Sequence, residues 1–419
     1  MGIYNLVIRC YALLIHLSAF RNLKARQWVQ GRKDWRKKLE AKLSALSNSP
    51  RVWMHCASYG EFEQGRPLLE AIKLRFPDTK IVLSFFSPSG YEAFKNWSGA
   101  DVVCYLPFDS TANARDFIQM VKPNQVIFIK YEFWLNFLNA LKRKRATVYL
   151  VSAVFKEHHP FFRWYGGIFK DSLSVFKTIF VQDSSSLKLL EKAGIKNAII
   201  SGDTRFDRVM QIRTQFEALP FFENYCKGRQ VIVAGSTWAK DEAFLLQAYN
   251  HLGENKPKLI LVPHEVDKKN ISETEARLKS AGLTYHLYSE VKARVEAMAE
   301  EVLVLDTVGL LSRVYHYADV VYVGGGFDSG IHNLLEPAVH LKPVLFCGQA
   351  DYSKYNEALE LIEIGAAKAL TQADDLAQSL NHFLDEKESK GPLEKNIQSY
   401  FEARSGSTQK VMEQVFGKA

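Results

Sequence analysis

The stretch that decides the fold runs from Asp319 to Phe346 and reads DVVYVGGGFDSGIHNLLEPAVHLKPVLF. A short apolar, β-branched run at 320–323 opens into three consecutive glycines. A polar turn follows, then an apolar helix-like segment from Leu334 to Leu341 and a second apolar run. This order predicts a strand, a glycine loop, a helix and a strand, which is the repeating unit of a parallel α/β sheet.

The glycine loop is a predicted phosphate site. Glycines directly after a strand let backbone amides face a ligand, and the first turn of the next helix adds N–H donors and partial positive charge. The predicted nucleotide-binding residues here are Gly325, Gly326, His332, Asn333 and Glu336, with Asn333 as a cap and Glu336 as an acceptor for ribose hydroxyls. An ordinary Asn-x-x-Glu helix cap explains the same spacing and stays open. The G-x-G-x-x-x-G spacing disfavours a nicotinamide site.

Apolar runs alternate with amphipathic segments on both sides of a break near 206–229. The predicted strands of the first half are 52–57, 80–86, 101–107, 125–130, 147–152, 177–182 and 198–202, and those of the second are 230–236, 258–263, 283–288, 301–306, 319–324 and 342–346. The pattern predicts two Rossmann-like, doubly wound parallel-sheet domains facing a shared cleft. The expected division is an anchor helix with a basic arm at 1–45, a first domain at 46–205, a linker at 206–229 and a second domain at 230–419.

Composition limits the class of protein. A chain of 419 residues with 47% hydrophobic residues fills two globular cores. The five cysteines are scattered and include no C-x-x-C pair, which argues against a zinc site or disulfide framework and fits a reducing cytoplasm. No Asp-x-Asp motif or histidine cluster with ligand spacing is evident, so we expect neither a metal nor a cofactor.

The amino terminus combines an apolar segment with concentrated charge. Residues 3–20 are mostly apolar but contain Arg9, and residues 21–42 hold nine Lys or Arg against two acids, a net charge of +7. Eighteen residues span roughly 27 Å, marginal for a bilayer core of about 30 Å. We therefore expect an interfacial anchor on anionic lipid rather than a nucleic-acid site, with a membrane span or a core helix as the alternatives. Aromatic and basic residues at 155–170 and 141–146 fit a second lipid contact.

Two acids follow predicted strands of the first half. Glu61 comes after the first strand, and Glu132 follows the strand at 125–130. Such carboxylates at strand ends could serve as general base and orienting group, although a first-turn Glu favoured by the helix dipole explains Glu61 equally well. Arg66 and Arg205 are the predicted acceptor- or anion-binding cations.

Three further corners of the second half carry polar groups after strands. Ser236 and Thr237 precede a helix, His264 follows the strand at 258–263, and Thr307 and Gly309 follow the strand at 301–306. Together with the glycine loop, these corners favour a nucleotide ligand over four unrelated caps.

As a set, these residues resemble the Kdo (3-deoxy-D-manno-octulosonic acid) transferases of Gram-negative bacteria. The shared blocks are GRKDWRKKL, WMHCASYGE ending at Glu61, YEFW with Glu132, SGDTRFD, AGST with its trailing Asp-Glu, ILVP, LDTVG and GGGFDSGIHNLLEP. Three features depart from the family pattern. The family often has Arg where this chain has His264, often Lys where it has Arg205, and often TELW where it has YEFW at 131–134.

The resemblance implies a GT-B glycosyltransferase on the cytoplasmic face of the inner membrane, acting in lipopolysaccharide biosynthesis. It implies CMP-Kdo as donor, bound mainly by the second domain, a lipid A precursor as acceptor, and Glu61 as catalytic base. Another GT-B enzyme that uses a UDP-sugar, as a transferase or epimerase, is the alternative within enzymes. A non-catalytic membrane-surface adaptor is the alternative outside them.

Overall fold

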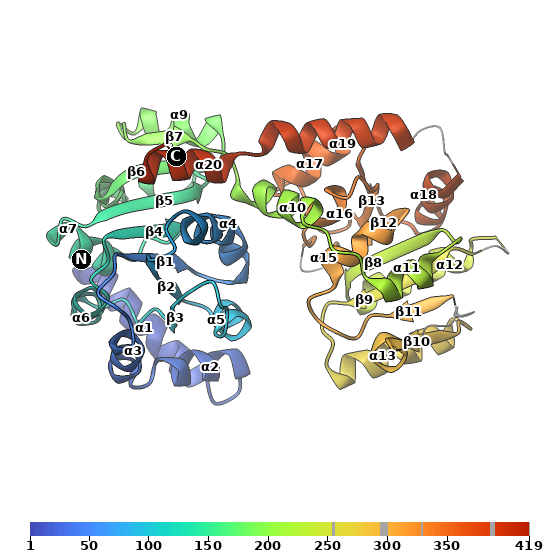
Figure 1. The fold of residues 1–419 in the computed structure, drawn as a ribbon, viewed down its shortest axis with the longest axis horizontal. Coiled ribbons are helices and arrows are strands. Elements are labelled where there is room, and N and C mark those ends of the chain that lie inside the picture. Colours follow the sequence, from blue (N-terminus) through green and yellow to red (C-terminus); the bar gives the residue numbers. More distant parts are fainter. Residues whose placement is uncertain (254–255, 294–300, 328–329, 386–389, 419) are drawn as a thin grey trace. The chain divides into compact units, whose positions relative to one another are not determined.

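The computed structural model describes residues 1–253, 256–293, 301–327, 330–385 and 390–418. The chain forms two compact units, Met1–Arg208 with Arg404–Ala419, and Val209–Ala403 (Figure 1). It leaves the first unit within one helix, Thr204–Thr214, and returns to it at the end of another, Lys390–Arg404. Within the glycine stretch, Asp328 and Ser329 lie outside the described residues.

The first unit contains a parallel seven-stranded sheet in the order β3-β2-β1-β4-β5-β6-β7. Its strands are β1 Arg51–Cys56, β2 Lys80–Phe85, β3 Val102–Tyr105, β4 Gln125–Ile129, β5 Thr147–Ala153, β6 Phe176–Val181 and β7 Ala198–Ile200. The strands are continuous apolar runs because helices cover both faces of the sheet. All seven strands predicted for this half are present.

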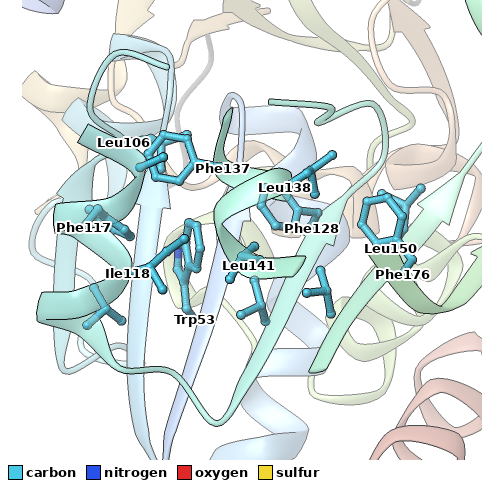
Figure 2. Close-up of a cluster of buried hydrophobic side chains, with 14 of the residues drawn as sticks. Trp53, Leu106, Phe117, Ile118, Phe128, Phe137, Leu138, Leu141, Leu150 and Phe176 are labelled. Atoms are coloured by element: carbon cyan, nitrogen blue, oxygen red, sulfur yellow. The ribbon is translucent and has the colours of Figure 1, made fainter. Parts of the chain in front are cut away.

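Helices on both faces complete the first unit. They are α1 Gly2–Ser18, α2 Leu23–Arg32, α3 Trp35–Ser44, α4 Tyr59–Arg75, α5 Pro88–Phe94, α6 Thr111–Val121, α7 Leu135–Arg143, η1 Pro160–Phe162, α8 Gly167–Ser172, η2 Leu173–Val175, α9 Ser184–Lys192 and α20 Ser407–Phe416, while α10 Thr204–Thr214 passes from the first unit into the second. Figure 2 shows the core on one face, where Trp53 of β1 packs among side chains of α6 and α7. Its indole lies 4.9 Å from the Phe117 ring and 5.9 Å from the Phe137 ring, centroid to centroid.

The carboxyl-terminal helix belongs to the first unit, whereas the sequence placed all of 230–419 in the second domain. Val411, Met412 and Val415 of α20 pack into the apolar cluster beneath α4. The Asp207 carboxylate accepts hydrogen bonds from the Gly406 and Thr408 amides at the start of α20. Burial of the apolar face of α20 and this capping hold the end of the chain on the first sheet.

The basic segment at 21–42 forms α2 and α3, which pack against the first sheet with Trp28, Leu39 and Leu43 buried. Among the described residues, no single helix is long and apolar enough to cross a bilayer. Only α1 and α2 taken together pass that test, and they bend by 119° at the break between them. The large apolar side chains of α1 are exposed, and Ile3 is 83% accessible.

The second unit contains a second parallel seven-stranded sheet, in the order β10-β11-β9-β8-β12-β13-β14. Its strands are β8 Val231–Thr237, β9 Lys258–Pro263, β10 Tyr285–Leu287, β11 Val302–Val304, β12 Val320–Val323, β13 Val344–Cys347 and β14 Ala367–Leu370. Six of them are the predicted strands, and β14 was not predicted.

The helices of the second unit are α11 Pro220–Cys226, α12 Ala239–Asn250, α13 Lys268–Ser280, α14 Tyr288–Val291, α15 Leu311–Val314, η3 Tyr315–Tyr317, α16 Leu335–Ala338, α17 Asn356–Glu363, α18 Ala373–Asp385 and α19 Lys390–Arg404. The segment predicted as a helix from Leu334 to Leu341 forms only α16, four residues long. The chain then turns at Leu341, which has φ of 62°, to enter β13. A helix this short has too few aligned peptides for the predicted dipole effect on an anion.

Candidate active site

Glu61 and Glu132 follow the two strands at which the first sheet reverses its order. In that sheet β1 pairs with β2 on one side and with β4 on the other. Glu61 lies in the first turn of α4 directly after β1, and Glu132 lies in the loop after β4. In doubly wound sheets this switch point opens a crevice at the carboxyl ends of the strands, which is where ligands bind.

Both carboxylates act electrostatically on the buried thiol of Cys56, at the end of β1. Burial raises the pKa of Cys56 well above its ordinary value, and the charges of Glu61 and Glu132 raise it further. Glu61 also accepts a hydrogen bond from the Ser58 hydroxyl at the start of α4. The two predicted acids therefore share one edge of the sheet.

Glu132 is 8% exposed and lies in a network of buried polar groups. Its Oε2 atom is 3.0 Å from Nε2 of His55 and accepts a hydrogen bond from the Trp134 indole N–H. The Nδ1 atom of His55 lies 3.0 Å from the Ser84 carbonyl oxygen. Because a carboxylate only accepts, the hydrogen bond to Glu132 requires the proton on Nε2, and the Ser84 hydroxyl, 2.9 Å from Nδ1, can donate to that atom.

The structure brings Arg205 to this edge and holds Arg66 on the α4 surface. The Arg205 guanidinium donates to Asp203 at 2.8 Å and influences Tyr131, the residue before Glu132. Burial raises the pKa of Tyr131, and the positive charge of Arg205 opposes that shift. Arg66 instead pairs along its own helix with Glu70 at 2.7 Å and Glu63 at 3.9 Å.

The second sheet has its switch point between β8 and β12, and Asp241 joins the loops that follow these strands. Its Oδ2 atom accepts hydrogen bonds from the Gly325 amide at 2.9 Å and from the Trp238 amide at 3.0 Å. Its Oδ1 atom accepts one from the Tyr322 hydroxyl at 2.9 Å. Asp241 is 1% exposed, and its three hydrogen bonds fix the conformation of the loops that follow β8 and β12.

Of the two glycines predicted to bind a ligand, Gly325 uses its amide within the protein, as does Gly324 before it. The Gly324 amide donates to the Gly235 carbonyl at 3.0 Å, and the Gly325 amide donates to Asp241. Gly325 has φ of 96°, which favours glycine, and a Cβ on Gly326 would overlap the Cys347 carbonyl oxygen. The glycines therefore serve close backbone packing first.

Three rings gather above this corner, from the loops after β8, β9 and β12. The His264 ring lies 4.5 Å from Trp238 and 4.4 Å from His332, nearly parallel to the latter at 18°. The Trp238 indole N–H donates to Nε2 of His332 at 3.0 Å, so that atom is unprotonated. Burial, with a smaller contribution from His264, lowers the pKa of His332 to about 4.

Thr237, predicted to offer its hydroxyl to a phosphate, is buried. Its Oγ1 donates to Glu242 at 3.2 Å, and Glu242 also pairs with Arg277 at 2.7 Å. Burial raises the pKa of Glu242, and Arg277 opposes that shift. Ser236, which precedes Thr237, is half-buried and has φ of 55°.

Asn333 and Glu336 bond to each other beside α16 but do not form the alternative Asn-x-x-Glu cap, because the N-cap residue is Leu334, which makes no side-chain capping bond. The Asn333 side chain accepts from the Leu335 amide at 3.0 Å and donates to Glu336 at 3.0 Å. Thr307 and Gly309 follow β11, which is separated from β8 by β9. The Thr307 hydroxyl oxygen is buried and has no hydrogen-bond partner within the described part of the chain.

The sequence did not identify His55, Trp134, Trp238 or Asp241 as site residues. A usable signal existed for Asp241, because an acid three residues after a helix N-cap fits a capping box. His55 lies inside a buried strand, and nothing in the spacing distinguishes it from a core residue. Across the described ranges, no group of three His, Cys, Asp or Glu side chains could hold a metal ion.

Comparison with known proteins identifies related sequences. Residues 33–208 match the family model described as 3-deoxy-D-manno-octulosonic-acid transferase (kdotransferase). The chain is 25% identical to the 3-deoxy-D-manno-octulosonic acid transferase of Bordetella pertussis over 98% of both chains. It is 27% identical to that of Chlamydia muridarum over 84% of this chain and 81% of the relative. A bifunctional glycosyltransferase/methyltransferase of Fusobacterium nucleatum is 25% identical, and the match covers 87% of this chain but only 57% of that protein.

Solved structures share the fold at low identity. A protein of Listeria monocytogenes described as a putative UDP-N-acetylglucosamine 2-epimerase matches with a TM-score of 0.61 at 12% identity. The match covers 88% of this chain and 96% of that one. The UDP-GlcNAc 2-epimerase of Neisseria meningitidis also has a TM-score of 0.61, at 14% identity over 88% of this chain and 100% of that one. These likenesses establish two GT-B-type Rossmann-like units. The family model on the first unit and the transferase relatives matched along most of the chain support the assignment of this glycosyltransferase to the 3-deoxy-D-manno-octulosonic-acid transferase family.

Proposed function

We propose that the protein transfers Kdo from CMP-Kdo to a hydroxyl of the lipid A precursor, in lipopolysaccharide biosynthesis. The observation that carries the proposal is the placement of Glu61 and Glu132 together at the switch point of the first sheet. A carboxylate pair at a ligand-binding edge suits the activation of a sugar hydroxyl. The match to the Kdo transferase family supplies the substrate class.

In the proposed reaction Glu61 is the general base. It takes the proton of the acceptor hydroxyl, whose oxygen forms the new bond to the anomeric carbon of Kdo. The bond from that carbon to the phosphate oxygen breaks, and CMP leaves with the electron pair. The Ser58 hydroxyl holds one oxygen of Glu61, and Glu132, fixed by His55 and Trp134, orients the acceptor or the reacting sugar.

The second unit is the proposed site for CMP. The loops after β8 and β12 meet at the switch point, where Asp241 fixes their shape. Above them, Trp238, His264 and His332 offer flat rings and imidazole nitrogens. An incoming phosphate would favour the protonated form of His332, since an opposite charge nearby raises the pKa of a base.

The proposed location is the cytoplasmic face of the Gram-negative inner membrane, with α1 lying in the interface. Its exposed apolar side chains include Ile3, Leu6, Leu13, Leu14 and Leu17. Lys37 and Lys38 on α3 are exposed and would meet anionic head groups, and Trp164, 96% exposed, offers a second contact.

The test measures CMP release from CMP-Kdo with and without a tetraacylated lipid A precursor, followed by mass spectrometry of the lipid. We expect acceptor-dependent release and one or more added Kdo masses. Glu61→Gln should abolish most turnover, whereas Glu40→Gln, an exposed acid on α3, should not. Full activity of Glu61→Gln would remove the base assignment. Absence of transfer, with binding displaced by UDP rather than CMP, would favour a UDP-sugar enzyme.

A further inference from the structure

We propose that helix α1 positions Glu132, with the Tyr4 hydroxyl as the positioning group, so that the proposed anchor helix is also part of the catalytic architecture. This inference rests on the proposed function of Glu132. It concerns a contact inside the first unit, between α1 and the loop that joins β4 to α7.

The start of α7 is capped from outside the helix. No side chain of its own N-cap residue, Trp134, makes a capping bond. Instead the Leu135 amide donates to the Tyr4 hydroxyl at 3.3 Å, the Asn136 amide to Asp109 Oδ2 at 3.2 Å, and the Phe137 amide to Asp109 Oδ1 at 3.1 Å. The first three amides of α7 thus depend on one residue of α1 and one buried acid, and a helix start without such partners is costly.

Tyr4 and Asp109 form one unit. The Tyr4 hydroxyl donates to Asp109 Oδ2 at 2.6 Å, and Asp109 is 2% exposed. Burial raises the pKa of Asp109, and the bonds from Tyr4 and the α7 amides oppose that shift. Next to them, Asn136 donates from its side chain to Asn5 at 2.9 Å, which adds a second bond between α1 and α7. Removing the Tyr4 hydroxyl would leave a buried carboxylate and a helix amide short of a partner.

A second contact reaches the same loop through aromatic rings. Tyr11 of α1 and Trp28 of α2 lie against Phe86, with ring centroids 6.3 Å and 5.8 Å away. Phe86 in turn stacks on Trp134 at 4.5 Å and 30°. The Trp134 indole N–H is the group that donates to Glu132. The carboxyl-terminal end of the short segment 132–134 is therefore held by contacts that begin on the amino-terminal helices, and the Trp134 indole links that end to Glu132.

The two faces of α1 have different tasks. Tyr4, Asn5, Ile8, Ala12 and Ile15 are half-buried and recur at helical spacing, so they form the face that meets the first unit. The large apolar side chains between them are exposed. A bilayer would thus bind the exposed face of α1, and the opposite face of the same helix caps the start of α7.

The test compares Tyr4→Phe with Tyr11→Phe, because both remove one hydroxyl from α1 and keep the ring. Tyr11 makes no hydrogen bond through its hydroxyl within the described residues and serves as the matched control. Spectra of protein labelled with 15N at tryptophan resolve the indole N–H groups, and Trp134→Phe identifies the Trp134 signal. We expect Tyr4→Phe, but not Tyr11→Phe, to shift that signal while leaving Trp238 of the second unit unmoved.

In the transfer assay Tyr4→Phe should lower kcat by about tenfold or more with KM for CMP-Kdo unchanged, since a misplaced group slows the reaction without touching the donor site. An unchanged Trp134 signal and kcat would overturn the proposal. If Tyr4→Phe fails to fold, Asp109→Asn, which weakens the same cap, decides by the same two readouts. If the wild-type protein showed no transfer activity, the proposed function would be refuted. The Trp134 indole signal would then still test whether Tyr4 positions this segment.

Discussion

The Nε2 atom of His55 lies 3.0 Å from a carboxylate oxygen of Glu132, and the two side chains are 0% and 10% exposed. A close polar pair in a low-dielectric setting is stabilising only while both members are present, because either one alone leaves an uncompensated group. The geometry therefore makes β1 and the loop after β4 depend on each other.

His55→Leu should accordingly destabilise the first unit by on the order of 3 kcal/mol, because Glu132 would stay buried with less compensation. Glu132→Gln should cost less, since an amide still accepts from Trp134. The double variant should be more stable than the sum of single effects predicts. Urea unfolding followed by tryptophan emission measures this, because six of the seven tryptophans lie in the first unit. Additive effects would mean that the pair is not coupled.

Gly326→Ala should disrupt the corner of the second unit. An added Cβ would overlap the Cys347 carbonyl oxygen, and backbone cannot yield as a flexible side chain does. We expect loss of CMP binding by calorimetry and a lower unfolding midpoint. Gly391→Ala in α19 is the matched control, because its Cβ would meet no atom within 4 Å. That change should be neutral or stabilise by up to about 1 kcal/mol. Equal behaviour of the two variants would contradict the packing role of Gly326.

The strand pattern was predictable because buried parallel strands are continuous apolar runs, as in 125–129 and 258–263. The strand β14 was not predicted because its sequence, AKAL, is short and includes an exposed lysine. The predicted length of α16 was wrong because the chain turns at Leu341 to pair β13 with β12. Local helix propensity does not encode that pairing.

The site was predictable where a polar residue follows a strand, as for Glu61, Glu132 and His264. It was not predictable where the function of a side chain depends on distant partners. His55 is held by hydrogen bonds with Ser84 and Glu132. The Thr237 hydroxyl donates to Glu242 and is therefore not offered to a ligand. Such networks join separate strands and helices, so they exist only after the sheet has formed.

The second unit should lose stability in mild acid through His340. Its Nε2 donates to the Ser312 carbonyl at 2.8 Å, and its Nδ1 is buried without a partner among the described residues. Burial lowers the pKa of His340 to about 4, with His316, Lys342 and Arg213 acting in the same direction. Between the unfolded value near 6.5 and the folded value, only the unfolded state holds the proton, so stability falls as pH falls.

We expect a loss on the order of 2 kcal/mol from His340 between about pH 7 and pH 5, and no further loss from it below the folded pKa. His340→Gln keeps a donor for Ser312 and does not titrate, so it should flatten this part of the profile. His251→Gln, at a side chain 51% exposed, is the control. The measurement is urea unfolding by circular dichroism across that range, and identical pH profiles for wild type and His340→Gln would contradict it.

Arg32 should prove structural rather than lipid-binding, although it lies in the basic segment. Its guanidinium donates to the carbonyls of Leu106, Trp28 and Phe86 at 2.9, 3.1 and 2.7 Å, and lies 4.0 Å from the Trp28 ring centre. Burial lowers the pKa of Arg32 to about 9, which leaves it charged at neutral pH. Lysine cannot reproduce three directed bonds from one planar group.

Arg32→Lys should therefore cost on the order of 2 kcal/mol in urea unfolding and leave binding to anionic vesicles unchanged. Arg36→Lys, whose exposed pair with Asp116 spans 2.8 Å, should cost less than about 1 kcal/mol. The opposite pattern is expected for Lys37→Gln with Lys38→Gln, because both side chains are exposed. That double variant should retain stability but weaken vesicle binding by roughly tenfold or more, at about 1 kcal/mol per lysine near the lipid surface. If Arg32→Lys weakened vesicle binding but left the free energy of unfolding unchanged, the structural role assigned to Arg32 and its three carbonyl partners would be wrong.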